Sequence, residues 1–371
     1  MTIKLSRRQA LAGGATVAAA AASPRTAAAA AGLRPRAAVI GHRGCPFLRP
    51  ENTLGAFAKA IADGADYIEF DLVPTSDGAI VVRHGNEISP NTDVAQHPEF
   101  ADRHKSQFIY EKEWTGWFTD DFTLAELKTL RGFEPLGDWR QESQTYNGWF
   151  QIPTFEEVID FVAAEAAARG RVIGLVPEIE FSTHFAAKGM PIDEKIASAL
   201  NAHAYTRFAP VEILSFEVTN LRTLRETFPR SGNVKLTQLI ANGSGTARDD
   251  RVRDGRRSYG EMITPEGLRD VATYADGISV VRDAIIPRNA DGSLARPTTL
   301  VADAHEAGLH VHAWTFYSEN GRIAANFRDD GPDYERNISG SVAELREYLA
   351  QGIDGVTVDD PAVARRAVDG E

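Results

Sequence analysis

Short apolar segments typical of strands alternate with helix-type segments along most of this chain. The strand-type segments lie at 39–41, 67–72, 172–178, 211–215, 234–240, 277–281, 309–315 and 354–358. The helix-type segments lie between these strands, near 154–169, 192–203, 218–228, 264–275, 298–307 and 342–351. Eight strand-type segments alternating with helix-type segments predict an α/β fold, a closed parallel TIM (β/α)8 barrel. An open doubly wound sheet is the alternative, but no glycine-rich nucleotide fingerprint follows the first strand.

One stretch near the start concentrates polar side chains at expected strand ends. The first strand runs into His42 and Arg43, and the second carries Glu69 and Asp71. Because these carboxylates are two residues apart, both point to one face of a strand. Histidine, arginine and paired carboxylates in this arrangement are typical of a metal-assisted phosphoryl or acyl transfer site.

A β-hairpin is expected directly after the second strand. Asp77-Gly78 lies between two strand patterns, which is the strongest short signal for a two-residue type I′ turn. In that register the returning strand, 79–84, places His84 opposite Asp71.

Barrel enzymes carry their chemistry at the C-terminal ends of the strands. Further polar or aromatic residues at such positions are Glu178, Glu180, Ser215, Glu217, Gln238 and Trp314. A solvated rim is the alternative interpretation of this pattern.

Eight short motifs resemble those of the glycerophosphodiester phosphodiesterases, particularly the secreted bacterial kind. In the family's order they are His42-Arg43-Gly44, Pro50-Glu51-Asn52-Thr53, Glu69-Phe70-Asp71-Leu72, Thr75-x-Asp77-Gly78, Val81-Val82-x-His84, Pro177-Glu178-Ile179, Val311-His312-Ala313-Trp314-Thr315 and Asp354-Gly355-Val356. The resemblance implies a phosphodiesterase that hydrolyses glycerophosphodiesters to sn-glycerol 3-phosphate and an alcohol.

The resemblance makes Glu69, Asp71 and Glu178 the metal ligands. Three carboxylates and no cysteine suit a hard divalent cation, Ca²⁺ first and Mg²⁺ as the alternative.

By the same resemblance, His42 and His84 form the acid/base pair. One imidazole activates the nucleophile and the other protonates the leaving alkoxide. Arg43 is expected to bind the substrate phosphate through its planar fork of donors. Trp314 is expected in the substrate pocket.

The motif after the third strand departs from the family pattern. The family has Pro-Glu-Ile-Lys, with the lysine facing the phosphate, whereas this chain has Glu180 in the lysine's place. Glu180 then either joins the metal shell or is compensated by another cation, for which Lys188 and Arg282 are candidates.

Two other functions stay open. A related barrel phosphodiesterase acting on lysophospholipid or sphingolipid head groups would be favoured by an exposed apolar rim. A barrel that binds metal and phosphodiester with little turnover is suggested by Glu180 alone, and the presence of both His42 and His84 argues against it.

Residues 1–31 carry the pattern of a twin-arginine export signal. Ser6-Arg7-Arg8-Gln9 precedes an Ala-rich apolar run with small residues suited to cleavage. The run is interrupted by Gly13-Gly14 and is too short to span a membrane, so no stable anchor is expected. We therefore expect export to a periplasm or the cell exterior, with the barrel domain over 32–371.

Net charge and cysteine content exclude some binding partners and an internal disulfide. The net charge is −12, which argues against nucleic-acid binding. The resemblance implies a small-molecule partner, a glycerophosphodiester. The single cysteine, Cys45, excludes an internal disulfide, and we interpret it as a packed residue rather than a nucleophile. Nothing in the sequence indicates an oligomeric state.

Residues 85–150 interrupt the alternation and are expected to form an insertion over one mouth of the barrel. One helix is predicted near 124–130, with Thr123 and Glu126 as its capping box. The insertion's tryptophans, Trp114, Trp117, Trp139 and Trp149, either line a substrate entrance or pack the insertion onto the barrel.

Overall fold

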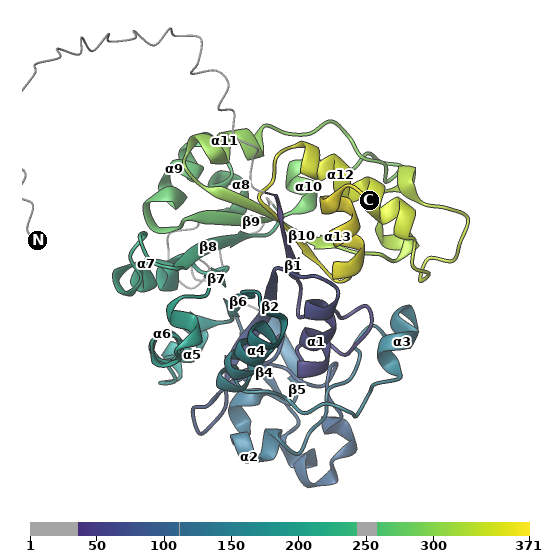
Figure 1. The fold of residues 1–371 in the computed structure, drawn as a ribbon. Coiled ribbons are helices and arrows are strands. Elements are labelled where there is room, and N and C mark those ends of the chain that lie inside the picture. The colour runs from purple at the N-terminus through teal and green to yellow at the C-terminus, as the bar shows by residue number, and fades with distance from the viewer. Residues whose placement is uncertain (1–35, 111, 243–257) are drawn as a thin grey trace, which may run out of the picture. The chain divides into compact units, whose positions relative to one another are not determined.

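Eight parallel strands close into a barrel, as the alternation predicted. The computed structural model describes residues 36–110, 112–242 and 258–371, so the expected export signal lies outside the described residues. Around the barrel the strands are β1 (Ala38–Gly41), β2 (Tyr67–Pro74), β6 (Gly174–Ile179), β7 (Val211–Ser215), β8 (Val234–Ile240), β9 (Gly277–Val281), β10 (His310–Phe316) and β11 (Gly355–Val358) (Figure 1). Since β1 pairs with both β11 and β2, the sheet is a closed ring.

Helices surround the barrel on its outer side (Figure 1). The longer ones are α1 (Leu54–Ala62), α4 (Phe155–Arg169), α6 (Asp193–Ala202), α7 (Val218–Thr227), α9 (Pro265–Tyr274), α11 (Leu300–Glu306), α12 (Ile338–Ala350) and α13 (Pro361–Asp369). The shorter ones are α5 (Ser182–Ala187), α8 (Tyr259–Met262) and α10 (Arg282–Ile285). None of the described helices has the length and apolar character needed to cross a membrane.

Local sequence explains where α4 begins and ends. Thr154 accepts a hydrogen bond from the Glu157 amide, and the Glu157 side chain reaches back to the Thr154 amide, which completes a capping box. Gly170 ends the helix with φ 62°, a conformation that costs glycine little. The position of α4 is thus set at both ends by short-range chemistry.

Side chains along each barrel strand alternate between the outer face, which packs against the helices, and the inner face, which points into the barrel. Phe70 points outward from β2, and its ring lies 5.9 Å from the rings of both Phe57 on α1 and Phe155 on α4. Burying a phenylalanine side chain contributes about 1.5–3 kcal/mol, so such contacts hold the helices on the sheet. The residues of the opposite face point into the barrel, where Glu69 and Asp71 lie on β2.

The hairpin after β2 forms, but the predicted register is wrong by one residue. Strand β3 (Ile80–Val82) pairs Leu72 with Val82, so Asp71 lies opposite Arg83. The backbone carbonyl of Asp71 accepts the Arg83 amide hydrogen at 2.9 Å. The loop has three residues, 76–78, and ends in Gly78 at φ 80°, the pattern of a type I turn followed by a left-handed residue.

Side-chain hydrogen bonds explain why the wider loop forms. Thr75 Oγ1 donates to Asp77 Oδ1 at 2.5 Å and accepts from the Ala79 amide at 2.9 Å. These bonds close the loop across Thr75 and Ala79, so Asp77-Gly78 does not occupy the centre of a two-residue turn.

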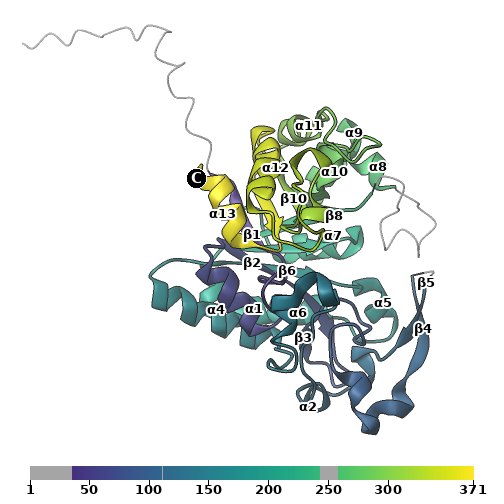
Figure 2. The same ribbon diagram turned by 90° about the vertical axis from the view of Figure 1, so that its right-hand side faces the viewer.

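The insertion contains one hairpin and two short helices. Its strands β4 (Lys105–Ile109) and β5 (Lys112–Gly116) are antiparallel (Figure 2). Its helices are α2 (Leu124–Leu127) and α3 (Gln141–Gln144) (Figure 1). The capping box of Thr123 and Glu126 is confirmed, although α2 ends three residues earlier than predicted. The hairpin was not predicted, because most of its side chains are exposed and it lacks an apolar alternation.

Short 3₁₀ helices complete the connections. They lie at Val94–Gln96, Pro98–Arg103, Thr119–Asp121, Gly137–Arg140, Tyr205–Arg207, Asn320–Arg322 and Ala325–Phe327.

Candidate active site

All eight residues predicted for the site lie at the C-terminal mouth of the barrel. A pocket of about 420 Å³ opens there, and its lining includes His42, Arg43, His84 and Trp314. A second hollow of about 200 Å³ shares those four residues and continues into the barrel, where Glu69, Glu178 and Glu180 line it. Asp71 lies beneath them, fully buried. Insertion residues form part of the outer pocket's wall, namely Gly85, Asn86, Glu87, Pro90, Asn91, Ile109, Trp114, Pro135, Leu136 and Arg140.

Three carboxylates meet at the floor of the site. One oxygen each from Glu69, Asp71 and Glu178 lies within 4.8 Å of the others, and all three residues are buried. The second oxygen of Asp71, Oδ1, is buried without a hydrogen-bond partner among the described residues. Burial and the charge of Asp71 raise the pKa of Glu69 well above its usual value. Because the three carboxylates repel one another and one buried oxygen has no hydrogen-bond partner among the described residues, the cluster is suited to bind a hard divalent cation through oxygen.

Two residues in left-handed conformations hold these carboxylates in place. Arg43, at φ 51°, donates its backbone N–H to Glu69 Oε2 at 2.6 Å. Asn52, at φ 57°, donates its side-chain amide to Asp71 Oδ2 at 2.7 Å, and its own amide N–H bonds Arg43 O at 3.0 Å. Asn52 was not predicted as a site residue, although it lies in the Pro50-Glu51-Asn52-Thr53 motif, which could have indicated a role.

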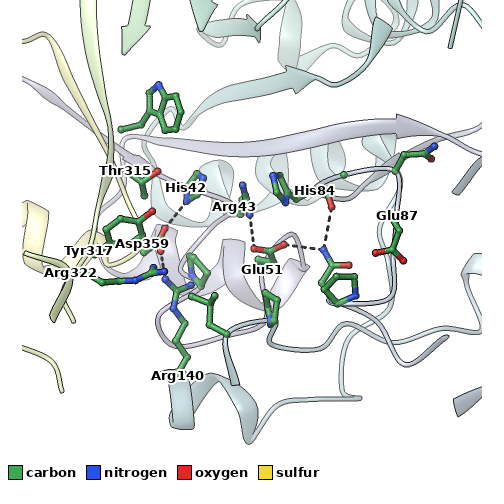
Figure 3. A pocket seen from close by; sticks show the side chains of 18 of the residues that line it. His42, Arg43, Glu51, His84, Glu87, Arg140, Thr315, Tyr317, Arg322 and Asp359 are labelled. Carbon is green, nitrogen blue, oxygen red and sulfur yellow. Dashed lines mark hydrogen bonds and ion pairs between the residues drawn. The ribbon is translucent and has the colours of Figure 1, made fainter. Parts of the chain in front are cut away.

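The guanidinium of Arg43 is fixed by acidic neighbours. It donates to Glu51 Oε2 at 2.8 Å (Figure 3). Its Nε lies 3.3 Å from Asp71 Oδ2. Burial alone would raise the pKa of Glu51, but the charge of Arg43 lowers it to about 2. A substrate anion in either hollow would therefore meet a guanidinium whose orientation is already set.

His42 ends a buried chain of charged side chains that crosses from the barrel to the insertion. Its Nδ1 lies 2.6 Å from Asp359 Oδ1, and Figure 3 shows Asp359 between His42 and Arg140. Arg140 in turn donates through Nε to Glu319 at 3.0 Å. Although burial opposes it, the charges of Arg140 and His42 hold the pKa of Asp359 well below its usual range. An ionised Asp359 requires the proton on Nδ1, which leaves Nε2 of His42 for chemistry.

We expect Asp359→Asn to lower kcat about 100-fold or more with little change in KM. An asparagine amide at this position can donate to Nδ1 and so force the opposite imidazole tautomer, a change that is severe in other histidine–aspartate pairs. The measurement is steady-state turnover across a pH series, because a positioning role also alters the pH profile. The matched control is Asp360→Asn, since Asp360 pairs with Arg336 at 2.7 Å instead. Equal kcat in wild type and Asp359→Asn would exclude the role.

His84 reaches the site from the loop that follows β3. Its side chain is 44% exposed, and Nε2 lies 3.8 Å from Glu180 Oε1. One atom each from His84, Asp71 and Glu180 falls within 4.8 Å of the others. The protein packed around the imidazole removes water from it, and this desolvation is the largest cause that lowers the pKa of His84 to about 4. The positive charge of Arg43 is the second cause. A neutral imidazole at ordinary pH is suited to accept a proton.

Glu180 anchors the loop that carries His84. It is 1% exposed, and its Oε2 accepts the Gly85 amide hydrogen at 2.7 Å. The two cations considered as compensation make contacts elsewhere: Lys188 pairs with Asp120, and Arg282 lies 3.4 Å from Glu344. The Glu180 carboxylate thus accepts a backbone hydrogen bond from Gly85, the residue that follows His84.

Some of the tryptophans considered for the substrate pocket line it, and others lie outside its lining. Trp314 lines both hollows and donates its Nε1–H to Ser279 O at 3.0 Å. Of the insertion's tryptophans, Trp114 lines the outer pocket, whereas Trp117 donates to Phe100 O at 2.6 Å inside the insertion. The other two, Trp139 and Trp149, are exposed and absent from the described lining.

Three polar residues at strand ends have structural contacts and do not line the described pockets. Glu217 Oε2 accepts the Thr183 amide hydrogen at 2.9 Å, and Ser215 Oγ accepts the Glu217 amide hydrogen at 3.0 Å. Gln238 donates to Ser215 O at 3.2 Å. The expectation that functional residues lie at the C-terminal ends of barrel strands therefore identified residues that line the pocket and also residues whose hydrogen bonds are structural.

Cys45 is fully buried, and burial raises its thiol pKa well above the usual value. A buried, protonated thiol is a poor nucleophile, in agreement with its interpretation as a packed residue.

Comparison with known proteins identifies the family. Residues 42–363 match the model of the glycerophosphoryl diester phosphodiesterase family. A glycerophosphodiester phosphodiesterase of Arabidopsis thaliana is 33% identical over 78% of this chain and 77% of its own. Another from Haemophilus influenzae is 28% identical over 85% of this chain and 88% of its own.

Solved structures show the same fold. A putative glycerophosphoryl diester phosphodiesterase from Silicibacter pomeroyi superposes with a TM-score of 0.61 at 21% identity, covering 91% of this chain and 94% of its own. A phosphodiesterase from Oleispira antarctica gives a TM-score of 0.58 at 20% identity, covering 90% of this chain and 97% of its own. The chain therefore belongs to the glycerophosphoryl diester phosphodiesterase family and is an enzyme of glycerophosphodiester hydrolysis.

Proposed function

We propose that this enzyme releases sn-glycerol 3-phosphate from small glycerophosphodiesters with the help of one Ca²⁺ ion held by Glu69, Asp71 and Glu178. The observation that carries the proposal is the meeting of three buried carboxylates, two imidazoles and Arg43 around one pair of hollows. An all-oxygen set of carboxylates favours Ca²⁺, with Mg²⁺ as the alternative. When bound, the cation supplies charge stabilisation to a phosphoryl oxygen.

The side chains supply the proton transfers. His84, neutral because its pKa is lowered, takes the proton from the attacking oxygen. His42 donates a proton through Nε2 to the departing alkoxide while Asp359 stabilises the imidazolium. Arg43 holds the non-bridging oxygens as negative charge develops.

The attacking oxygen we favour is the glycerol hydroxyl next to the phosphate. Its attack forms a cyclic phosphate and breaks the bond from phosphorus to the head-group oxygen, which leaves as the alcohol. Water then opens the ring, with the imidazoles exchanging roles, to give glycerol 3-phosphate. The Oleispira antarctica structure was solved in complex with sn-glycerol-3-phosphate, which supports this product class for the present fold.

The large apolar side chains exposed on the described chain are not part of the pocket lining. The large apolar side chains that are exposed in the described chain are Phe108, Trp139, Trp149, Val172, Phe208 and Tyr334. None of them lines the described pocket. The apolar rim that a lysophospholipid or sphingolipid enzyme would need is therefore not formed by these residues.

The test is turnover of glycerophosphocholine and of lysophosphatidylcholine, each with and without chelator. We expect release of glycerol 3-phosphate from the first substrate, lost in chelator and restored by Ca²⁺. Preference for lysophosphatidylcholine would favour the lipid enzyme. Metal binding without turnover of either substrate would favour the binding barrel.

We expect Glu180→Lys to reduce kcat and weaken metal binding rather than to improve phosphate affinity. The change removes the acceptor of the Gly85 amide and places a cation beside His84. Turnover kinetics and metal titration measure both effects. Glu180→Gln, which keeps an acceptor oxygen, is the control and should retain more activity than the lysine variant. A lower KM with unchanged metal affinity would contradict this expectation.

A further inference from the structure

A second polar cluster lies inside the barrel, at the end opposite the active site. Glu212 is the second residue of β7, and His310 and His312 are the first and third residues of β10. All three therefore lie near the starts of parallel strands, whereas His42 and its partners lie at their ends. The reaction described above uses none of these three residues.

An apolar layer separates the cluster from the active site. Ile40, Val176, Leu214 and Leu239 form a small buried cluster inside the barrel. Leu214 follows Glu212 on the same face of β7, and Val176 precedes Glu178 on the same face of β6. The lower cluster is thus chemically independent of the catalytic carboxylates.

The distances within the lower cluster match a metal coordination shell. His312 Nδ1 lies 3.1 Å and His310 Nε2 lies 3.2 Å from the same oxygen, Glu212 Oε1. One atom from each of the three side chains lies within 4.8 Å of the others. Donors about 2.0–2.2 Å from a common ion stand roughly 3–3.5 Å apart, so small adjustments would admit an ion.

Two glycines make room for the imidazole rings. Gly277 pairs in register with His310, and a Cβ built there would lie 2.1 Å from His310 Nε2. Gly355 pairs with His312, and a Cβ there would lie 2.7 Å from His312 Cδ2. Any larger residue at either position would displace a ring, so this part of the barrel is shaped around the two histidines.

The surroundings also suit a ligand set. Thr237 Oγ1 donates to Glu212 Oε1 at 2.7 Å, as outer groups commonly do to a ligating carboxylate. The His310 side chain is 25% exposed, which leaves a route for an ion from solvent.

We propose that Glu212, His310 and His312 form a second metal site, for a borderline transition ion such as Zn²⁺. Two imidazoles and one carboxylate favour Zn²⁺ over Ca²⁺, and water completes the shell. The ion would join β7 to β10, strands that are not neighbours in the barrel. Since it binds the folded chain, it would raise the melting temperature.

The experiment measures Zn²⁺ bound per chain, in untagged protein dialysed with excess Ca²⁺, together with the visible absorption of the Co²⁺ form and the melting temperature. Wild type and Asp71→Ala are expected to retain one Zn²⁺, and Glu212→Gln and His312→Ala to lose it together with the Zn²⁺-dependent rise in melting temperature. The control is His305→Ala, because His305 is an imidazole on α11 that pairs with Asp354 at 2.8 Å outside the cluster.

Equal Zn²⁺ content in wild type and Glu212→Gln would overturn the proposal. So would the absence of bound Zn²⁺ in wild type, which would identify the cluster as a hydrogen-bonded ion pair. If His312→Ala fails to fold, Glu212→Gln decides alone, because it keeps the size of the side chain; its circular dichroism spectrum confirms folding.

Discussion

Replacing His42 or His84 with alanine is expected to lower kcat for glycerophosphocholine by about 100- to 10,000-fold in each case, the usual contribution of general acid–base groups. His84→Ala removes the imidazole whose lowered pKa suits a base. His42→Ala removes the imidazole held by Asp359 at 2.6 Å. Because both act in one step, the double variant should lose far less than the product of the two single losses.

The control for this experiment is His97→Ala, which changes an imidazole of the insertion that lies 3.1 Å from Glu99 and outside the described pocket lining. Its kcat should match that of wild type. The measurement is steady-state kinetics with Ca²⁺ in excess, so that a change in metal affinity does not imitate a loss of acid–base chemistry. Near-normal turnover by His84→Ala would exclude it as the base.

The barrel could be predicted because its signals are local. Strands buried on both faces appear as continuous apolar runs, and the eight expected runs lie within two residues of the observed strands. Helix starts were readable where a capping box stands before an apolar period, as at Thr123 and Thr154. Helix α13 was not predicted, although Pro361 at its first turn and Gly370 at its end are helix signals.

The hairpin register could not be read from the turn dipeptide alone. Asp77-Gly78 favours a two-residue turn, but Thr75 closes a three-residue loop through its own side chain. The strand then ends at Val82, so His84 reaches the site from a loop instead of from a paired position. The resemblance had assigned His84 its role by motif, and that assignment did not depend on the register.

Parts of the site that depend on distant residues were missed for a physical reason. Arg140, Glu319 and Asp359 come from the insertion and from two loops far apart in sequence, and only the folded chain places them in contact. Alternation on β10 predicts that His310 and His312 share a face, but nothing local places Glu212 of β7 beside them.

Replacing Asp71 with alanine is expected to abolish metal-dependent hydrolysis and divalent-cation binding at the active site while the barrel stays folded. Asp71 Oδ2 lies 3.3 Å from Arg43 Nε, and the buried Oδ1 of Asp71 is without a hydrogen-bond partner among the described residues. Two like charges about 4 Å apart repel by roughly 4 kcal/mol at an effective dielectric constant near 20, so a cation is the natural balance for this cluster. Removing one of three ligands takes away much of that attraction.

The metal-free stability of this variant separates a metal ligand from a structural aspartate. Asp71→Ala relieves repulsion on Glu69 but takes a partner from Asn52 and Arg43, so its metal-free melting temperature should change little. We expect Ca²⁺ to raise the melting temperature of the wild type and to leave that of Asp71→Ala unchanged. Asp71→Asn, which keeps an acceptor for Asn52 but not the charge, should behave like alanine, whereas Asp160→Ala, an exposed change on α4, should behave like wild type. Calcium titration and thermal unfolding measure these differences. Full turnover by Asp71→Ala, or by wild type in excess chelator, would show that the three carboxylates do not hold a catalytic ion.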